Sequence, residues 1–460
     1  MMEPIENLRD RGTYYAINKI IGLLSKASVD RFVSLTYWGE KLTKDPEING
    51  AIKHIREFLT QEDHPARELF YRVFNTLSEH NRRRIFQSLF LNAWFLGGRK
   101  RDYWEKTLGF RPPFILILSP TLKCNLRCKG CYTLGYGLDH ELPLELAERI
   151  LKECEELGIY FVTMLGGEPM VYPHLFDLIE GHPGIFFQIY TNGTLLTQEN
   201  AQRFADYGNV AVVLSIEGGQ EETDSWRGKG VYKKIMRAFE YLNKARITIG
   251  TSATVTRQNV EAVSSDEFID KMIALGSFAQ MYFLYIPVNG MADFSLMVTP
   301  EQRDHLRRRV LAIRNTKPLF VLDFWNDGPY VNGCIAGGRR YFHINAKGDV
   351  EPCVYTHIAS DNIRNTSLAQ ALNSQLFRDI RGRQPHNPNH LRPCMIIDNP
   401  DVMRDVIKRN RCYFTHPGAE EIYTFRYKYM DNYAKAYAPL ADWVWKEEYL
   451  NLKEAGQGRP

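Results

Sequence analysis

Three cysteines lie close together in the first third of the chain. Cys124, Cys128 and Cys131 follow a short apolar run at residues 114–118, with the spacing Cys-x3-Cys-x2-Cys. A closed structural zinc site needs four ligands, whereas a four-iron cubane held by three cysteines leaves one iron open to another ligand. The alternative is a zinc site completed by a distant histidine such as His140, because zinc accepts mixed cysteine and histidine ligands.

The stretch from Cys124 to Tyr132 resembles the signature of the radical S-adenosylmethionine (radical SAM) enzymes. In that family the three cysteines hold a 4Fe-4S cluster, and the amino and carboxylate groups of SAM chelate its open iron. The resemblance implies an electron donor such as flavodoxin or ferredoxin, cleavage of SAM to a 5'-deoxyadenosyl radical, and removal of hydrogen from an unactivated carbon. That step needs no acid or base, and the sequence identifies no catalytic residue. One departure is Gly130, where many members have an aromatic residue against the adenine.

The segment Gly166-Gly167-Glu168-Pro169 follows the second predicted strand. Glycines let the backbone approach a ligand closely, and a carboxylate can accept hydrogen bonds from an ammonium group. The segment resembles the family element that binds the amino group of SAM. We therefore expect Gly166, Gly167 and Glu168 to contact the cofactor.

Polar residues also follow the third and fourth predicted strands. We predict that Thr191 and Asn192 lie near the ligand, although an Asn-Gly pair also suits an ordinary turn. Family members with a Ser-x-Asp-Gly strand end provide the model for the next group. By this resemblance Ser215 and Arg227 are expected at the SAM carboxylate and Glu217 at the ribose, with glutamate standing in place of aspartate.

A second group of cysteines lies in the last third of the chain and comprises Cys334, Cys353, Cys394 and Cys412. The spacing from Cys334 through Gly348 to Cys353 resembles the SPASM and twitch extensions of radical SAM enzymes, and residues 344–353 predict a hairpin with a Lys-Gly turn. Four cysteines match one auxiliary 4Fe-4S cluster, which would support an oxidative outcome. A four-cysteine zinc site is the alternative, and a three-cysteine twitch-like site would leave out Cys412.

Six apolar runs alternate with amphipathic helices in the middle of the chain, at residues 114–118, 160–165, 186–190, 210–216, 247–255 and 279–286. This alternation predicts an α/β fold with a partial (β/α)6 TIM-like barrel whose ligands lie at the carboxyl ends of the strands. The predicted domains are a helical N-terminal domain (1–112), a radical SAM core (113–300), a SPASM/twitch-like auxiliary-cluster domain (301–415) and a helical C-terminal tail (416–460).

The predicted N-terminal helices cover residues 13–24, 48–59, 66–77 and 82–96. The last of them is strongly apolar, and basic residues flank the segment 82–101. Such a segment can make peripheral contact with a membrane surface. More often such a segment packs on a neighbouring domain with its basic ends in solvent.

The composition is that of a globular protein, since 44% of the 460 residues are hydrophobic and 24% are charged. No apolar run approaches the ~20 residues that cross a bilayer, and the N-terminus lacks the succession typical of a signal peptide. We therefore expect a cytoplasmic protein, where clustered cysteines suit metal binding better than disulfides. The net charge of +4 gives no argument for a nucleic-acid partner.

Together these patterns predict a radical SAM oxidoreductase that modifies or cross-links a peptide, because SPASM members often act on ribosomally made peptides. Such maturases frequently carry a winged-helix recognition module with three strands, and residues 1–112 show no strand pattern. Carbon-carbon coupling of lipid acyl chains by the same radical chemistry is therefore an alternative. An iron-sulfur electron-transfer protein and a zinc-binding protein are the non-enzymatic alternatives.

Overall fold

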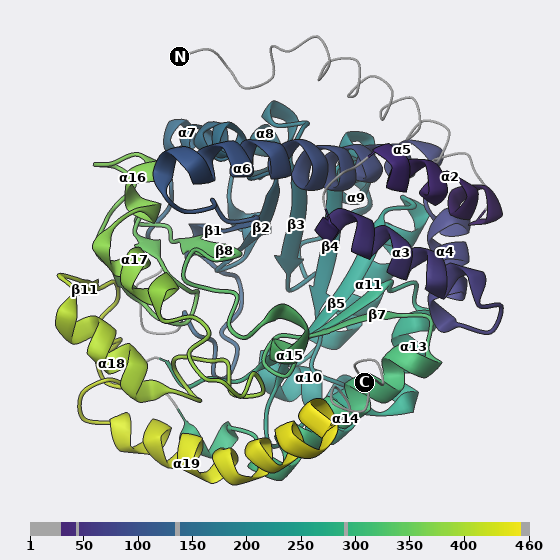
Figure 1. Cartoon of the computed structure of the whole chain (residues 1–460). Helices are drawn as coiled ribbons and strands as arrows, with labels where there is room; N and C mark the ends of the chain where they lie inside the picture. The colour runs from purple at the N-terminus through teal and green to yellow at the C-terminus, as the bar shows by residue number, and fades with distance from the viewer. Residues whose placement is uncertain (1–28, 43–45, 134–138, 289–292, 452–460) are drawn as a thin grey trace.

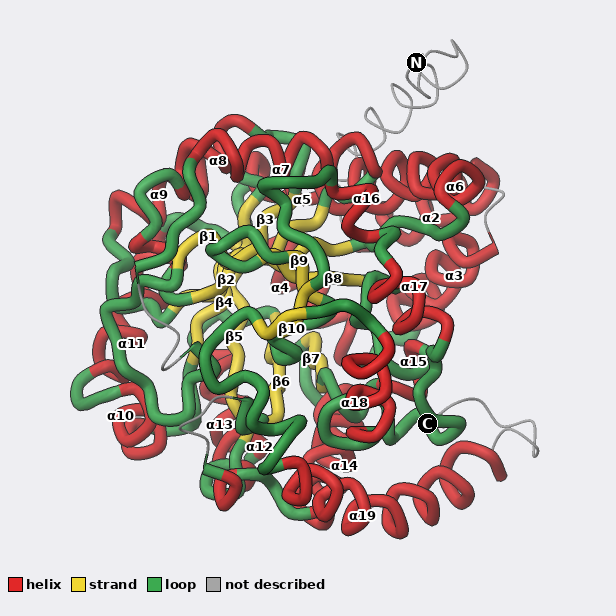
Figure 2. The backbone as a smooth tube through the Cα atoms, turned by 90° about the vertical axis from the view of Figure 1, so that its left-hand side faces the viewer, coloured by secondary structure: helices red, strands yellow, loops and turns green. Residues whose placement is uncertain are grey.

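The structure is a computed structural model that describes residues 29–42, 46–133, 139–288 and 293–451. The helix predicted at residues 13–24 lies outside the described residues. A curved parallel sheet forms the centre of the molecule, and helices surround it (Figures 1 and 2). The strands of this sheet are β1 (Ile115–Thr121), β2 (Phe161–Gly166), β3 (Phe186–Thr191), β4 (Val210–Ser215), β5 (Thr248–Val255), β6 (Ala279–Leu284), β7 (Phe320–Asp323), β8 (Tyr341–Ile344) and β9 (Val350–Glu351).

The spatial order of the strands is β7-β6-β5-β4-β3-β2-β1-β8-β9. All neighbouring pairs from β7 to β8 are parallel, and β9 pairs with β8 in the antiparallel direction. The carboxyl ends of the parallel strands therefore share one edge, where a barrel enzyme binds its ligands. The predicted partial α/β barrel is confirmed.

The six predicted strands correspond to β1–β6, with ends that differ by at most three residues. The structure adds β7 and β8 at the two sides of the sheet. Each has only four residues, which is too short for a clear sequence pattern, and both come from the region expected to form the auxiliary domain. The predicted hairpin is formed by β8 and β9, and Gly348 in its turn has a left-handed φ of 92°.

Helices cover the outer face of the sheet (Figure 2). Ile150, Leu151 and Leu157 form the buried stripe of α7, and the strands are buried along most of their length, as expected for a parallel sheet covered on both faces. The helices between and after the strands are α7 (Leu144–Leu157), η2 (Pro169–Val171), α8 (Leu175–Gly181), α9 (Gln198–Tyr207), α10 (Gln220–Arg227), α11 (Val231–Lys244), α12 (Val260–Ser264), α13 (Asp266–Ala274), η3 (Phe294–Leu296), α14 (Pro300–Thr316), α15 (Gly328–Val331), α16 (Leu368–Leu372), α17 (Gln375–Gly382), α18 (Pro400–Arg409), α19 (Tyr427–Val444) and η4 (Trp445–Leu450).

The described N-terminal region is helical, as predicted. Its helices are α2 (Val29–Leu42), α3 (Pro46–Thr60), α4 (Pro65–Thr76), α5 (Glu79–Ile85), the π-helical η1 (Phe86–Leu96) and α6 (Gly97–Leu108). Among them, α6 lies beside α7 at the top of Figure 1, and α4 packs against α14.

The apolar segment 82–101 packs against the barrel, with contacts from η1 to β2 and β3 and from α6 to α7. None of the side chains from Ile85 to Leu96 is exposed. Its basic residues bind backbone carbonyl groups of the barrel, since Arg84 Nη2 donates to Pro183 (2.8 Å) and the buried Arg101 donates to Gly158. These contacts favour the packing of the segment on the barrel, which is the alternative that the sequence offered, and the membrane contact stays a prediction. No helix among the described residues has the length and apolar character to span a bilayer.

The C-terminal helix α19 runs along the side of the molecule opposite α6 and α7 (Figure 1). A fully buried arginine, Arg303 on α14, ties it to the cysteine-rich region. Arg303 Nη1 donates to Asp398 Oδ1 at 2.6 Å, and its guanidinium lies 3.9 Å from the centre of the Tyr437 ring. A buried charge needs such partners, so this contact holds α14, α19 and the loop of Asp398 together.

Candidate active site: two cysteine centres at the strand ends

The loop after β1 carries the first three cysteines. All three are partly buried, and backbone bonds shape the loop, since Leu126 N–H points to Cys124 Sγ (3.4 Å) and Cys131 N–H donates to the Cys128 carbonyl (3.3 Å). Burial raises the pKa of the Cys124 thiol and raises that of Cys128 to about 12. These thiols need the positive charge of a metal centre to ionise at neutral pH.

The histidine proposed for the zinc alternative, His140, differs from these cysteines in its exposure to solvent. The His140 side chain is exposed, while its backbone carbonyl accepts a hydrogen bond from Leu122 (3.0 Å). The His140 backbone thus pairs with the residue that follows β1. The three cysteines of the loop after β1 form a donor set that fits a cubane with one open iron.

The two glycines after β2 allow a close contact between strand ends. Gly167 N–H donates to the Thr121 carbonyl and Glu168 N–H donates to the Lys123 carbonyl, both at 2.9 Å. A Cβ atom on Gly167 would lie 2.2 Å from the Lys123 carbonyl oxygen, and Gly166 has a φ of 115°. Only glycine fits these two positions without moving the backbone that leads into Cys124.

The buried carboxylate of Glu168 joins this segment to the end of β3. It accepts hydrogen bonds from Thr191 Oγ1 (2.6 Å), Asn192 N (2.8 Å) and Met170 N (3.1 Å). Burial raises the pKa of Glu168 and these donors lower it, with a net rise. The structure thus brings the predicted residues Glu168, Thr191 and Asn192 together.

Asn192 also reaches the cysteine loop. Its amide Nδ2 donates to Asn125 Oδ1 at 2.9 Å and lies 3.9 Å from Cys124 Sγ. Its Oδ1 accepts from the backbone of Thr194 at 2.9 Å, which is the turn that the Asn-Gly pair suggested. The turn and the contact with the cysteine loop are therefore both present.

At the end of β4, Arg227 and Glu217 form a buried ion pair. Arg227 Nη2 donates to Glu217 Oε1 at 2.7 Å, Nε donates to Oε2, and Nη1 lies 4.0 Å from Cys128 Sγ. Burial lowers the pKa of Arg227, but the effect of the Glu217 carboxylate, which raises this pKa, is larger. The guanidinium therefore stays charged. The sequence analysis predicted that both residues contact SAM, but it did not predict the ion pair between them. Ser215 is partly buried and accepts a hydrogen bond from Ser252 Oγ at 3.4 Å.

Two aromatic side chains fill the space beside Gly130. A Cβ atom on Gly130 would lie 2.7 Å from Tyr285 Cε2 and 2.8 Å from Trp226 Cη2. The two rings pack edge to face with their centres 5.9 Å apart. Sequence reasoning missed both residues, although Trp226 directly precedes Arg227. They explain how this chain accommodates glycine where an aromatic residue was expected.

The second centre is a cavity of about 100 Å³ lined by Cys334, Cys353 and Cys394. Tyr341 and Tyr355 also line it, and Tyr341 Oη lies 3.0 Å from Cys353 Sγ. Burial raises the pKa of all three cysteines, so this donor set also requires a metal charge to ionise. Three thiols from distant segments therefore converge on one apolar cavity.

The fourth predicted ligand, Cys412, is not among the residues that line this cavity. Its Sγ lies 3.8 Å from the Ile407 carbonyl oxygen. The loop of Cys394 is instead fixed by Asp398, which accepts the Cys394 N–H at 3.0 Å and pairs with Arg303. The assignment of Cys412 as a ligand stays a prediction.

Two tyrosines connect the cysteine centres. Tyr132 directly follows Cys131, and Tyr355 lies two residues after Cys353. Their rings meet at an angle of 65° with their centres 5.9 Å apart. The loops of the two centres are thus in contact through aromatic rings.

Comparisons with known proteins agree with this arrangement. A family model described as "Radical SAM superfamily" matches residues 118–273, and one described as "Iron-sulfur cluster-binding domain", SPASM, matches residues 334–395. The mycofactocin maturase MftC of Mycolicibacterium smegmatis is 31% identical over 297 residues, which cover 60% of this chain and 74% of that protein. The chain belongs to the radical SAM superfamily. The predicted family, its SPASM extension and its enzymatic nature are confirmed.

Other similar proteins have different names. An AdoMet-dependent heme synthase of Oleidesulfovibrio alaskensis is 26% identical over 294 residues, which cover 57% of this chain and 75% of that protein. The structure of SuiB from Streptococcus suis bound to its precursor peptide SuiA has a TM-score of 0.53 and 21% identity, with coverage of 62% of this chain and 71% of SuiB. The latter similarity supports the fold.

The two matched regions contain the two cysteine centres of this radical SAM enzyme. The first region includes the cysteines after β1, and the second includes Cys334, Cys353 and Cys394 but ends before Cys412. The radical SAM domain implies a 4Fe-4S cluster and SAM, and the SPASM domain implies auxiliary iron-sulfur binding. The buried or partly buried thiols of both centres fit these groups.

Proposed function

We propose that this radical SAM enzyme carries out an oxidative modification of a peptide, such as a cross-link or a dehydrogenation. The observation that carries the proposal is the contact between Tyr132 and Tyr355, which joins the two cysteine centres. Oxidation of a substrate radical requires an electron acceptor near the site where the radical forms. The similarity to the maturase MftC, and the fold shared with SuiB bound to a precursor peptide, support a peptide as the substrate.

We propose that Cys124, Cys128 and Cys131 hold the SAM-binding 4Fe-4S cluster. When bound, this cluster and SAM supply the 5'-deoxyadenosyl radical that removes hydrogen from the substrate. The residues of the chain fix the cofactor in place and exclude water. In this proposal the glycines at 166 and 167 give the backbone access to SAM, and Glu168 faces its amino group.

Ser215 and Arg227 remain the proposed contacts of the SAM carboxylate. Arg227 has Nη1 directed to Cys128, while Glu217 occupies Nε and Nη2. We therefore assign Glu217 to positioning Arg227, in place of the ribose contact expected from the sequence. Thr191 and Asn192 are assigned to holding Glu168 and the cysteine loop.

We propose that Cys334, Cys353 and Cys394 hold the auxiliary cluster. When bound, a 4Fe-4S cluster in this cavity supplies an acceptor for the electron of the substrate radical. Tyr341 and Tyr355 exclude water around these cysteines. The lining of the cavity favours these three cysteines over Cys412 as ligands.

The rim of the first centre suits an acidic electron donor such as flavodoxin or ferredoxin. Lys123, Arg127 and Lys129 are exposed and alternate with the partly buried residues of the cysteine loop. Opposite charge increases the rate at which a donor approaches such a surface. We prefer a peptide to the lipid alternative, because the apolar side chains of the segment 82–101 are at least partly buried and a similar protein is a maturase.

The proposal can be tested by co-expressing the protein with short peptides encoded beside its gene and measuring their masses. The expected result is a peptide that loses two hydrogen atoms only when Cys124 and SAM are present. The same extracts should be analysed for altered lipids and porphyrins, because a similar protein is named a heme synthase. A Cys124-dependent change in one of those compounds, with unmodified peptides, would contradict the peptide proposal.

A further inference from the structure

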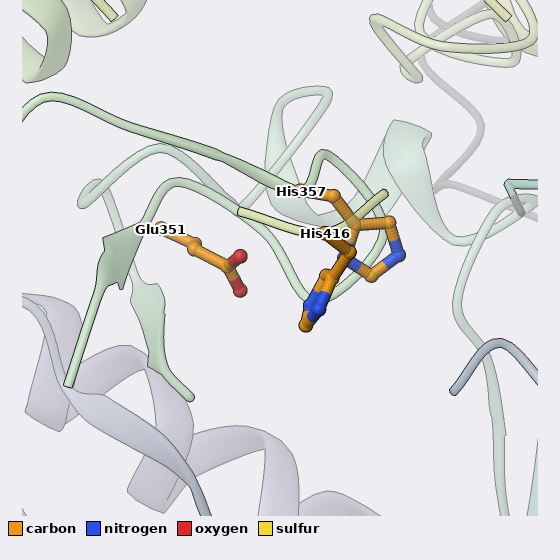
Figure 3. A group of neighbouring side chains, drawn as sticks. All are labelled: Glu351, His357 and His416. Atoms are coloured by element: carbon orange, nitrogen blue, oxygen red, sulfur yellow. The ribbon is translucent and has the colours of Figure 1, made fainter. Parts of the chain in front are cut away.

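A third group of metal-binding side chains lies outside both cysteine centres. Glu351, His357 and His416 each offer a ligand atom, and these atoms all lie within 4.8 Å of one another. Figure 3 shows the Glu351 carboxylate near the two imidazole rings, whose centres are 4.9 Å apart. Neither cysteine centre includes any of the three.

Two distant segments of the chain bring these residues together, one carrying Glu351 and His357 and the other carrying His416. Glu351 ends β9, and His357 directly precedes β10 (Ile358–Ala359). The antiparallel pairing of β10 with β11 (Tyr413–Phe414) continues as a hydrogen bond from Thr415 N–H to the His357 carbonyl at 2.9 Å. This pairing carries His416 to the side of His357. Their approach is therefore fixed by the backbone.

The group is buried, with Glu351, His357 and His416 exposed by 0%, 2% and 5%. Burial is the main cause that lowers the pKa of both histidines, that of His416 to about 3. A neutral imidazole is the form that binds a metal. His357 also has a φ of 49°, a left-handed conformation that is uncommon for histidine and is held here by the surrounding structure.

The carboxylate is oriented by a second layer of polar groups. His343 Nδ1 lies 2.5 Å from Glu351 Oε2, and the other nitrogen of His343 lies 2.7 Å from Ser119 Oγ. Asn345 Nδ2 donates to Glu351 Oε1 at 3.3 Å, and the Thr415 hydroxyl donates to the same oxygen. Hydrogen bonds of this kind fix the direction of ligating carboxylates in metal sites.

We propose that Glu351, His357 and His416 form a third metal site, which binds one divalent transition ion. Two imidazoles and one carboxylate are a donor set of zinc enzymes and of non-heme iron proteins, so Zn²⁺ and Fe²⁺ fit the site. It contains no thiolate and is therefore unsuited to an iron-sulfur cluster.

The site lies beside the first cysteine loop. The His357 ring is nearly parallel to that of Tyr132, with centres 6.2 Å apart and an angle of 14° between the planes. A bound ion would fix β9, β10 and β11 behind Tyr132. This proposal is independent of the peptide substrate, and its test does not require an active enzyme.

The test uses the full chain with its iron-sulfur clusters loaded, incubated with excess Zn²⁺ and desalted. We expect about one tightly bound zinc per chain, with an X-ray absorption spectrum that shows only nitrogen and oxygen ligands at about 2.0–2.1 Å. A sulfur shell at about 2.3 Å would instead mean that zinc had entered a cysteine centre, and it would overturn the assignment. Zinc binding below about one tenth per chain would also overturn the assignment to zinc, unless Fe²⁺ occupies the site.

The iron arm uses ⁵⁷Fe and Mössbauer spectroscopy. A high-spin Fe²⁺ signal outside the cluster signals, displaced by Zn²⁺, would show that iron occupies the same site. Absence of both ions from wild-type protein would refute the third metal site.

Variants separate a metal site from a hydrogen-bonded network. His357→Asn suits the left-handed backbone, since asparagine tolerates that conformation, and His416→Asn removes the second imidazole. Each should lower the zinc content at least tenfold while iron and sulfide stay unchanged. The control is His182→Asn, because His182 is equally buried and lies 3.1 Å from the carboxylate of Glu155. Retention of zinc in both test variants would contradict the proposal. If either variant loses its iron-sulfur clusters, the X-ray absorption spectrum of the zinc-loaded wild-type protein decides whether the site exists.

Discussion

Arg227 is held by Glu217 with its remaining nitrogen, Nη1, 4.0 Å from the sulfur of Cys128. Glu217 is fully buried, and Arg227, the last residue of α10, is largely buried and reaches the cysteine loop. It places a permanent positive charge beside thiols that must ionise to bind iron. The pair thus links the end of β4 to the first cysteine centre.

We predict that Glu217→Gln strongly impairs the enzyme. Breaking a buried ion pair leaves Arg227 without its counter-charge and costs about 3–5 kcal/mol of stability. Loss of the orientation of Arg227 should also lower the rate of 5'-deoxyadenosine formation by about 10- to 100-fold. The thermal midpoint and the rate are measured on protein with equal iron content.

The matched control is Asp266→Asn, which removes the partner of Arg309 on the surface. We expect it to leave both quantities unchanged, because exposed ion pairs contribute little. Glu217→Gln protein with wild-type activity and stability would show that the pair has no positioning role.

The close contact between the ends of β1 and β2 predicts that Gly167→Ala is destabilising. Its Cβ would lie 2.2 Å from the Lys123 carbonyl oxygen, so the backbone before Cys124 must move. Overpacking of this kind costs about 1–3 kcal/mol. We expect a lower thermal midpoint and faster loss of iron during gel filtration.

Gly181→Ala at the end of α8 is the control, because nothing lies within 4 Å of its added Cβ and alanine favours a helix. Equal iron retention in both glycine variants would argue against a role for this contact in holding the cysteine loop.

The cavity predicts different effects for two cysteines of the second group. Cys353 lines the cavity and Cys412 does not. We expect Cys353→Ser to lose about four irons per chain and Cys412→Ser to keep them, since a 4Fe-4S cluster contains four irons. Iron and sulfide are counted after anaerobic reconstitution. Equal iron loss in both variants would identify Cys412 as a fourth ligand.

The sequence predicted the parts of the molecule that depend on local patterns. The runs that form β1–β6 are long enough to show strand character, and residues directly after them could be assigned to one edge of the sheet. This reasoning brought Glu168, Thr191 and Asn192 together correctly. Turn chemistry likewise predicted the hairpin of β8 and β9.

The sequence patterns did not predict the contacts between distant segments of the chain. The pairing of β8 with β1 and of β10 with β11 depends on tertiary packing. The strands β8 and β11 have only four and two residues, which is too short for a clear sequence pattern. The group of Glu351, His357 and His416 depends on that packing, as does the filling of the space at Gly130 by Trp226. The apolar segment 82–101 was ambiguous because a buried helix and a membrane-surface helix share one composition.

The most direct test of the account is anaerobic reconstitution followed by reduction with SAM and detection of 5'-deoxyadenosine. We predict about eight sulfides per chain, because two 4Fe-4S clusters contain eight sulfides and the third metal site contains none. We also predict that 5'-deoxyadenosine forms with the wild-type protein and does not form with Cys124→Ala. Cys154→Ala, which alters a buried cysteine on α7, should retain the product. Zinc in place of iron at the cysteines, or product formation unaffected by the loss of Cys124, would contradict the central claim.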